Sequence, residues 1–411
     1  MNNLRKLFAF LKAIRLGFLV PVIQLCRGED PKLQMRLIAQ QIVLPLAAII
    51  LGLLLWQSLA SKINTNLGTF PGPTETWQAY ESLQEEARVE ALKEKHFNHK
   101  QLSRMVRRGG VDSEVGIWLV EDEGVAPEVV TWLAENRPPT RFNEADYAAF
   151  LEPVAGEPEP VSEARDMDYV NGLYLAAGKA FKGSETVKVR DYGGKPTYGE
   201  QIRKSLWTVF TGFVIASLVA IPIGILCGLN KSIYSALNPF IQVGKPVSPL
   251  AWLPLVTLVV VALYEPTEEG LEISFIVSAL VVALCSLWPT LVNTAVGVAN
   301  TDPDHLNVAR VLKLSWFSRL FKIILPGSLP LMFTGLRISL GVGWMVLIAA
   351  EMLAQNPGLG KFVWDMFQNG SSETLSLIVV ACLTIGLIGF FLDTIMGALQ
   401  TLVSFEEKHS S

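Results

Sequence analysis

Cysteine and histidine are scarce in this chain of 411 residues, with four of each, and neither forms a ligand pattern. No Cys-x-x-Cys pair occurs, which excludes a zinc ribbon and gives no sign of a disulfide framework. His96 and His99 lie three residues apart, but no third ligand is in view, and we expect them on an exposed helix. The sequence predicts no metal site.

The phosphate-binding loop Gly-x4-Gly-Lys-[Ser/Thr] is also missing. The nearest imitation, residues 193–196, lacks the first glycine and has Pro196 in place of the hydroxyl that would hold magnesium. No nucleophile–base arrangement or pair of carboxylates stands out. We therefore expect no catalytic residue, no enzymatic activity and no ATP bound to this chain. A net charge of -4 argues against nucleic-acid binding.

Long apolar segments are what the sequence has in abundance. Hydrophobic residues make up 50% of it, and they gather in blocks of about twenty, the length a helix needs to cross about 30 Å of hydrocarbon. The blocks predict an all-α membrane protein with six transmembrane helices, at residues 37–60, 206–229, 243–264, 273–296, 329–353 and 375–402.

The blocks divide the chain into five parts. Residues 1–36 are basic, with apolar residues three or four apart, and are expected to form an amphipathic segment on the cytoplasmic surface of the membrane. The first span, 37–60, precedes a polar, acidic insert at 61–200. Residues 201–404 hold five further spans, and residues 405–411 form a short tail.

The distribution of charge orients these spans. Lysine and arginine gather in the N-terminal segment, at Lys231 and Lys245, and in residues 310–322, whereas the insert and residues 265–272 are acidic. Short cytoplasmic loops carry an excess of positive charge. We therefore expect a multi-pass protein of a bacterial inner membrane, with both termini in the cytoplasm and the insert in the periplasm.

A basic amphipathic stretch, residues 307–326, separates two of the apolar blocks. Five of its apolar residues repeat every fourth position and predict one helix with an apolar face: Val308, Leu312, Trp316, Leu320 and Ile324. Such a helix can rest on the ends of spanning helices and present its polar side to a cytosolic protein. Pro326 is expected to end it, because proline removes a backbone donor and disfavours helix at the preceding residue.

This stretch resembles the EAA loop of binding-protein-dependent ABC importer permeases, in which coupling helices seat in a cleft of the ATPase subunit. The consensus Glu-Ala-Ala-x3-Gly falls on Asn307, Val308, Ala309 and Lys313; only Ala309 matches, while the Leu-Pro end is intact. The resemblance implies a coupling loop at 297–326. Its contacts to the ATPase would come from Asn307, Val308, Ala309, Arg310, Lys313, Leu325 and Pro326.

Longer stretches are similar to the nitrate, bicarbonate, cyanate and taurine branch of that family. They are FPGPTETW (70–77), KPVSPLAWLP (245–254), SLWPTLVNTAVGVA (286–299), FTGLRISLGVGWMVLIAAEMLA (333–354) and NPGLGKFVWD (356–365). The resemblance implies a type I importer permease for a small inorganic anion, nitrate or nitrite first. It also implies ATPase subunits that bind ATP and Mg, a periplasmic or lipid-anchored binding protein, and a second permease copy in a homodimer. The permease itself would need no cofactor.

Anion passage needs hydrogen-bond donors rather than a deep fixed cation, which would trap the ion. The candidates for lining a pathway are Ser248, Trp252, Thr290, Asn293, Arg337 and Trp344, each of which can equally serve helix packing. For Arg337 we favour snorkelling to the membrane surface, or a structural pair with Asp393, over anion contact. Glu351 is expected near the outer mouth, and Gly335, Gly341 and Gly343 at sites of close packing.

Alternatives of other classes remain open. A secondary transporter or channel working alone would be favoured by internal repeats or broken half-helices, and no repeat is evident. A membrane-anchored sensor would need an output domain, which the tail does not offer. The insert has two alternatives of its own, docking of the binding protein or passive decoration.

Overall fold

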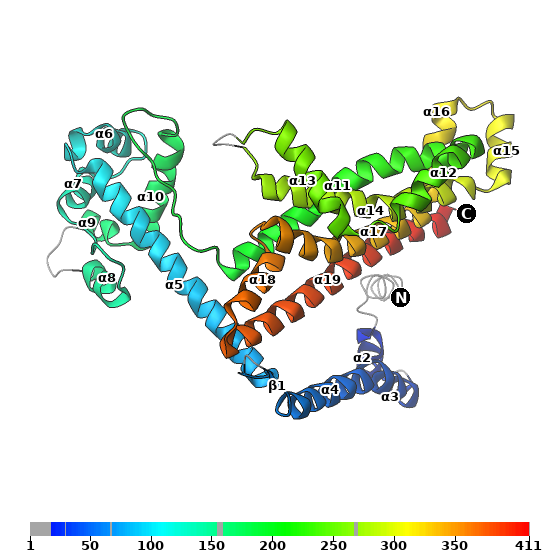
Figure 1. Ribbon diagram of the computed structural model, residues 1–411, viewed down its shortest axis with the longest axis horizontal. Helices are drawn as coiled ribbons and strands as arrows, with labels where there is room; N and C mark the ends of the chain where they lie inside the picture. The colour runs from blue at the N-terminus through cyan, green and yellow to red at the C-terminus, as the bar shows by residue number, and fades with distance from the viewer. Residues whose placement is uncertain (1–17, 29, 66–67, 154–158, 267–269, 411) are drawn as a thin grey trace. The chain divides into compact units, whose positions relative to one another are not determined.

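The computed structural model describes residues 18–28, 30–65, 68–153, 159–266 and 270–410. It is mainly helical (Figure 1) and forms two compact units, each described here by itself. The first, the membrane unit, comprises Met1–Tyr80 and Gly199–Ser411; the second, the insert unit, is Glu81–Tyr198. The insert unit is shorter than the predicted 61–200, since residues 61–80 belong with the membrane unit.

The first span is one unbroken run of helix. It joins α3 (Pro31–Ile38), the π-helix η1 (Ala39–Val43) and α4 (Leu44–Ala60). Nearly every side chain of α4 is exposed, as a helix surrounded by lipid requires. Before it comes α2 (Leu19–Cys26); the amphipathic helix expected from residue 4 onward falls largely on residues 1–17, outside the described residues.

A short hairpin follows the first span. Its strands β1 (Asn64–Thr65) and β2 (Gly68–Thr69) are antiparallel. The Trp56 indole of α4 donates a hydrogen bond to the Pro71 carbonyl at 3.1 Å. This contact fixes the direction in which the chain leaves the end of the span.

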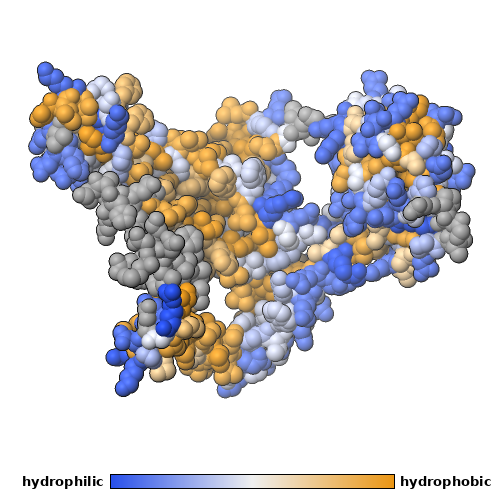
Figure 2. All heavy atoms as spheres, turned by 180° about the vertical axis from the view of Figure 1, so that it is seen from behind, coloured by the Kyte–Doolittle hydropathy of each residue, from blue (hydrophilic) through white to orange (hydrophobic). Residues whose placement is uncertain are grey.

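Among the described residues, ten helical segments follow the insert unit. They are α11 (Tyr198–Leu229), α12 (Lys231–Gly244), α13 (Pro249–Leu263), α14 (Ile273–Ala299), α15 (Pro303–Val311), α16 (Trp316–Arg319), η3 (Leu320–Ile324), α17 (Leu325–Ala354), α18 (Leu359–Asn369) and α19 (Ser372–Ser410). Among the described residues five helical runs are long and apolar enough to cross a membrane, or six if the bent pair α12–α13 is one span. Figure 2 shows apolar side chains covering much of this unit.

The span predicted at 243–264 is not one continuous helix, because the chain bends by 102° between α12 and α13. The sequence Lys-Pro-Val-Ser-Pro at 245–249 explains the break. Each proline lacks a backbone donor and disfavours helix at the residue before it. Ser248 then starts the new helix, its hydroxyl accepting a hydrogen bond from Leu250 N at 3.3 Å.

Each of the two π-helices among the described residues lies before a Leu-Pro pair. η1 ends one residue before Leu44-Pro45, and η3 lies directly before Leu325-Pro326. A proline inside a helix clashes with the carbonyl four residues earlier, and a wider turn relieves that clash. The helix therefore continues through Pro326, and the prediction that Pro326 ends it is wrong.

Helix α14 forms the centre of the membrane unit and packs chiefly on α17. Glycines permit its close approach to neighbouring helices. A Cβ at Gly212 of α11 would lie 2.6 Å from Ala279 O, and one at Gly335 or Gly343 of α17 would lie 2.7 or 2.6 Å from α14 side chains. Gly335 and Gly343 are thus close-packing positions, as expected, whereas a Cβ at Gly341 would meet nothing within 4 Å.

The insert unit is a bundle of helices with its own apolar core. It contains most of α5 (Pro73–Val106), with η2 (Gly110–Asp112), α6 (Glu114–Glu121), α7 (Pro127–Glu135), α8 (Glu144–Leu151), α9 (Glu159–Ala164) and α10 (Met167–Ala180). Residues such as Leu102, Leu119 and Leu133 are fully buried. Among its described residues, exposed large hydrophobic side chains are few.

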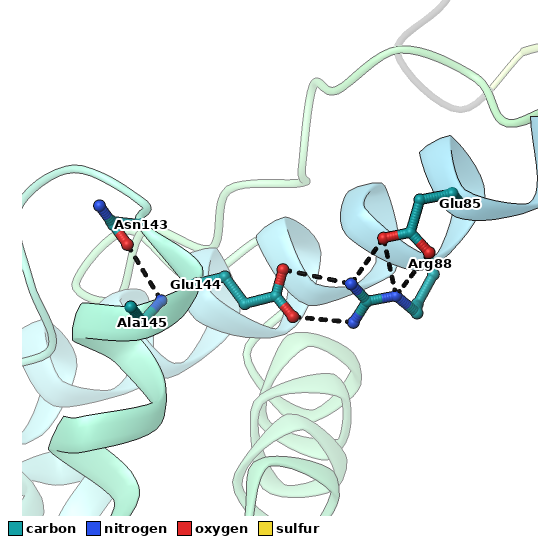
Figure 3. Close-up of polar contacts among 5 residues, drawn as sticks. All are labelled: Glu85, Arg88, Asn143, Glu144 and Ala145. Carbon is teal, nitrogen blue, oxygen red and sulfur yellow. Dashed lines mark hydrogen bonds and ion pairs between the residues drawn. The ribbon is translucent and has the colours of Figure 1, made fainter. Parts of the chain in front are cut away.

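Polar contacts join α5 to the later parts of this unit. Figure 3 shows Arg88 between Glu85, on its own helix, and Glu144 at the start of α8. Asn143 caps α8 through Ala145 N at 3.0 Å. The Arg88 contacts are exposed, so solvent screens them. Glu90 is less exposed and accepts hydrogen bonds from Tyr192 Oη and Lys195 N, which holds the returning chain on α5.

His96 and His99 are buried, contrary to the expectation of an exposed helix. His99 is fully buried among the rings of Trp132, Tyr147 and Phe150. Burial lowers the pKa of His99 to about 3, and nearby His96 contributes to this lowering. In the part of the chain that the structure describes, no three possible ligands gather in a way that could hold a metal ion.

The buried His99 makes the insert unit sensitive to acid. The folded state holds the imidazole neutral down to a pKa of about 3, while an unfolded histidine takes up a proton near pH 6.5. Stability is therefore complete above about pH 6.5 and falls as the pH drops towards 3. At pH 5 we expect the unit to lose about 2 kcal/mol relative to pH 7. Hydrogen exchange of α5–α7 amides in the full chain measures this, and a His99→Phe variant should lose most of the pH dependence.

Candidate functional site

The predicted coupling loop contains two helices joined by a tight turn. Residues 303–324, from α15 to η3, are here called the coupling segment. α15 begins after Asp302, whose carboxylate accepts a hydrogen bond from Asp304 N at 2.9 Å. It ends at Val311, and α16 begins at Trp316 after the cap Ser315. The apolar residues at every fourth position predicted one helix from 307 to 326. They are in fact divided between two helices, so that prediction is wrong.

Lys313 explains the turn. Its φ of 48° is in the left-handed region, and Leu314 N donates to Ala309 O at 3.1 Å. This is the bond of a Schellman motif, in which the residue at C′ is usually glycine. Lys313 thus adopts the backbone conformation suited to the glycine that the family consensus has at this position.

Lys313→Gly should therefore stabilise the folded protein. A side chain with φ near +50° costs about 1 kcal/mol that glycine avoids. We expect a higher midpoint of thermal unfolding for Lys313→Gly than for Lys313→Ala, which removes the same charge but keeps the Cβ. Equal midpoints for these two variants would show that the turn carries no strain.

One side of the coupling segment is anchored in the membrane unit. Ala309 is 1% exposed. Leu320 and Ile324 pack with Val298 at the end of α14, against Ile225 of α11. The segment is thereby fixed to the ends of two spanning helices, as an element that receives force from outside would require.

The other side carries an exposed apolar surface, here called the coupling patch. It comprises Val311, Leu312, Trp316, Phe317 and Phe321, with exposed fractions from 48% to 82%. Trp316 and Phe317 meet edge to face, with ring centroids 5.0 Å apart. α15 and α16 lie together beyond the end of α14 (Figure 1). Phe317 was not among the residues predicted from sequence, because it does not belong to the set of apolar residues at every fourth position.

The remaining predicted contact residues lie around this patch. Asn307, Lys313 and Pro326 are exposed, and Leu325 is half-buried at the start of α17. Val308 and Arg310 belong to α15, but their side chains fall outside what the structure describes. An exposed apolar patch rimmed by polar residues marks a site of interaction with a protein or a membrane.

The candidate pathway residues do not form one cluster. Thr290 is fully buried and its hydroxyl lies 2.7 Å from Ser339 Oγ, while the Trp344 indole donates to Ile385 O at 3.0 Å. Asn293 donates to Pro289 O of its own helix at 2.8 Å. These contacts favour the packing alternative for all three.

Two candidates lie at or near the break between α12 and α13. Ser248 caps α13, as described above, and Trp252 is half-buried one turn later with no hydrogen-bond partner for its Nε1 atom among the described residues. Their place at a bend between two helices keeps them candidates for a pathway.

Arg337 forms the pair with Asp393 that we favoured. Its Nε lies 2.5 Å from Oδ1 and its Nη2 lies 2.8 Å from Oδ2, a bidentate contact between α17 and α19. Both side chains are partly exposed, at 32% and 41%. Glu351, by contrast, is fully buried and does not face an opening.

Comparison with known proteins identifies the family. Residues 220–404 match the family described as binding-protein-dependent transport system inner membrane component. The chain is 40% identical over 205 residues to the nitrate import permease protein NrtB of Synechocystis sp., covering 50% of this chain and 70% of that protein. It is 37% identical over 208 residues to NrtB of Leptolyngbya laminosa, covering 51% and 70%. The chain belongs to this family.

A relative with another named substrate is about equally similar. The bicarbonate transport system permease protein CmpB of Synechococcus elongatus is 39% identical over 197 residues, covering 48% of this chain and 66% of that protein. The predicted resemblance to importer permeases is confirmed, and this chain is a multi-pass inner membrane component. The family match contains the coupling patch, Arg337 and Asp393, while the insert unit lies outside it.

Proposed function

We propose that this chain is the permease subunit of an ATP-driven ABC importer that carries a small inorganic anion into the cytoplasm, nitrate or nitrite first. The observation that carries the proposal is the identity of 37–40% to nitrate import permeases over about half the chain. Bicarbonate, cyanate and taurine or other sulfonates are the alternatives within the same architecture. The identity to a bicarbonate permease is similar and does not distinguish these substrates. Selection would then rest mainly with the binding protein.

The proposed partners follow from the coupling patch. Separate ATPase subunits would bind ATP and Mg, so this chain would need no cofactor and would not be an enzyme. Each ATPase would hold the coupling patch of one permease, and two copies of this chain would enclose the pathway. Closure of the ATPases on ATP would move α15 and α16, and with them the inner end of α17. Binding energy in the closed state would thus favour the outward-open permease.

The proposed orientation puts the coupling patch and both termini in the cytoplasm and the insert unit in the periplasm. Acidic residues outnumber lysine and arginine there, 22 to 15 within residues 81–198. An acidic surface does not attract a nitrate ion, which favours contact with a protein. We therefore propose that the insert unit helps to seat the binding protein.

Deletion of the insert unit tests this role. Replacing residues 81–198 with a flexible linker should weaken docking of the binding protein at least tenfold, because the acidic surface is lost. Association with the ATPase should remain, since the coupling patch lies in the other unit. Binding to immobilised permease measures both. Undiminished docking and transport would identify the insert unit as a passive decoration.

The bend between α12 and α13 supports a second candidate, a secondary transporter or channel that works alone. Broken helices line the sites of many secondary transporters. Ser248 and Trp252 would then contribute to such a site. Under this candidate the exposed coupling patch has no role.

Uptake in cells tests the proposed substrate. Cells with and without this chain are given labelled nitrate, in competition with nitrite, bicarbonate or taurine. We expect uptake that requires the chain and is reduced by nitrite. If uptake is reduced by bicarbonate or taurine and not by nitrite, that compound would be the substrate in place of nitrate.

A further inference from the structure

A buried carboxylate joins three helices at the end of α17 away from the coupling patch. Glu351 is fully buried in the membrane unit. Its two carboxylate oxygens accept hydrogen bonds from the Ser205 hydroxyl of α11 at 2.7 and 3.0 Å. One of them also accepts a hydrogen bond from Gly360 N of α18 at 2.8 Å. The carboxylate therefore contacts α11 and α18 from its position on α17.

These contacts cap α18 from outside its own sequence. The first amides of a helix have no partner within it, and when buried they need one. Gly358, at the N-cap position of α18, has no side chain to supply it. Ser205 Oγ accepts from Leu359 N at 2.9 Å, and Glu351 accepts from Gly360 N.

The two glycines let the chain come this close. A Cβ at Gly358 would lie 2.2 Å from the Glu351 carboxylate, and one at Gly360 would lie 2.2 Å from Ile348 O of α17. A larger residue at position 360 would displace α18 from α17, and one at position 358 would displace the Glu351 carboxylate. The Gly-Leu-Gly sequence is thus matched to a carboxylate at position 351.

A second link lies one helical turn along α11. The Asn356 side-chain amide donates to Thr208 Oγ1 at 3.3 Å, and both residues are fully buried. Thr208 follows Ser205 by one helical turn. Two successive turns of α11 therefore make hydrogen bonds to residues 356–360. Such a connection resists tilting of α18 as well as its separation.

Helix α17 connects this joint to the coupling segment. It begins at Leu325, directly after η3, and Glu351 lies 26 residues further along, about 39 Å away along the helix axis. A displacement of the coupling segment therefore acts on one end of α17, and α18 is attached to the other.

We propose that Glu351 is a positioning residue: its carboxylate, with the Ser205 hydroxyl, fixes the start of α18 on α11 and α17, so that movement of α17 is passed on to α18. Transmission of movement from α17 to α18 rests on the proposed function, whereas the attachment of α18 to α11 and α17 does not. Glu351 acts here through α18 and touches no transported ion.

Hydrogen exchange of the full-length protein in lipid nanodiscs tests the fixing of α18. Loss of its acceptor should raise the exchange rate of the Gly360 amide at least tenfold in Glu351→Ala, and that of the Leu359 amide at least tenfold in Ser205→Ala. Glu351→Gln keeps an acceptor oxygen and should change the rate less. Glu272→Gln is the control, since Glu272 pairs with neighbouring Lys204 but does not touch α18. Unchanged exchange in both alanine variants would overturn the proposal.

ATP hydrolysis by the assembled transporter tests the passing on of movement. In Glu351→Ala we expect basal hydrolysis and the yield of the complex to stay unchanged, while stimulation by the loaded binding protein falls at least tenfold and Glu351→Gln restores part of it. Stimulation at the wild-type level in Glu351→Ala would overturn the proposal that movement of α17 is transmitted to α18 through this residue. If the wild-type chain assembles with no ATPase, the proposed function and the relay fail together, while the exchange result still decides the role of Glu351 at α18.

Discussion

Replacing Phe317 with aspartate is expected to weaken association with the ATPase subunits at least about 30-fold and to abolish uptake. Phe317 belongs to the coupling patch and is 68% exposed, so the change leaves the core of the permease intact. The aspartate would place a charge in an apolar interface, where it loses its water without gaining a partner. Co-purification of tagged permease with the ATPase measures the effect.

Phe317→Leu is the matched control for this variant. It keeps an apolar side chain at the same position and should retain most of the association. Charge reversal of both Arg310 and Lys313 should reduce association as well, by removing positive charge from this part of the chain. Insertion in the membrane should be normal in each case. Wild-type uptake by Phe317→Asp, or by the double reversal, would show that this segment does not couple to an ATPase.

Replacing Arg337 with methionine is expected to destabilise the protein by about 3 kcal/mol, because it leaves the Asp393 carboxylate in a spanning helix without the guanidinium. The two side chains now form a bidentate contact at 2.5 and 2.8 Å between α17 and α19. Removing both charges, in Arg337→Met with Asp393→Leu, should restore most of the stability. The yield of monodisperse protein and its thermal unfolding measure both variants.

Transport by the double variant separates the two roles considered for Arg337. If the pair is structural, the double variant carries the anion at a rate near that of the wild type. If the guanidinium contacts the anion, both variants are equally inactive although the double variant is stable. We expect the first result, since both donor groups of Arg337 that the structure shows in contact are directed at Asp393.

The spanning helices were predictable because their signal is local. Twenty apolar residues need no partner to be recognised, and α14 was placed to within three residues of its end. The bend at 245–248 was missed although both prolines are visible in the sequence. A proline in a span is often tolerated, as Pro222 in α11 is, so proline alone does not predict a break.

The coupling segment shows how a regular pattern can mislead. Its apolar residues repeat every fourth position, which is correct for one helix, but Lys313 interrupts that helix in a left-handed conformation. A glycine there would have predicted the turn, whereas lysine gives no such signal. The capping residue Ser315, two positions later, was the available clue.

Apart from the Arg337–Asp393 pair, contacts between distant residues were not predicted from the sequence. Glu351 was expected near an opening because a carboxylate in a span usually faces water or a partner. Its partner Ser205 is 146 residues away, and a serine in a span has no distinctive spacing. The burial of His99 was missed for the same reason, since the rings around it come from α7 and α8.

The central claim, that this chain transports an anion at the expense of ATP hydrolysed by a partner, is tested most directly in proteoliposomes. Permease, ATPase subunits and binding protein are reconstituted, and labelled nitrate is followed with ATP on the cytoplasmic side. We predict accumulation above the external concentration that requires ATP and the binding protein and is absent with Phe317→Asp. Nitrate entry through the permease alone, without ATP, would contradict the account and identify a secondary transporter or channel.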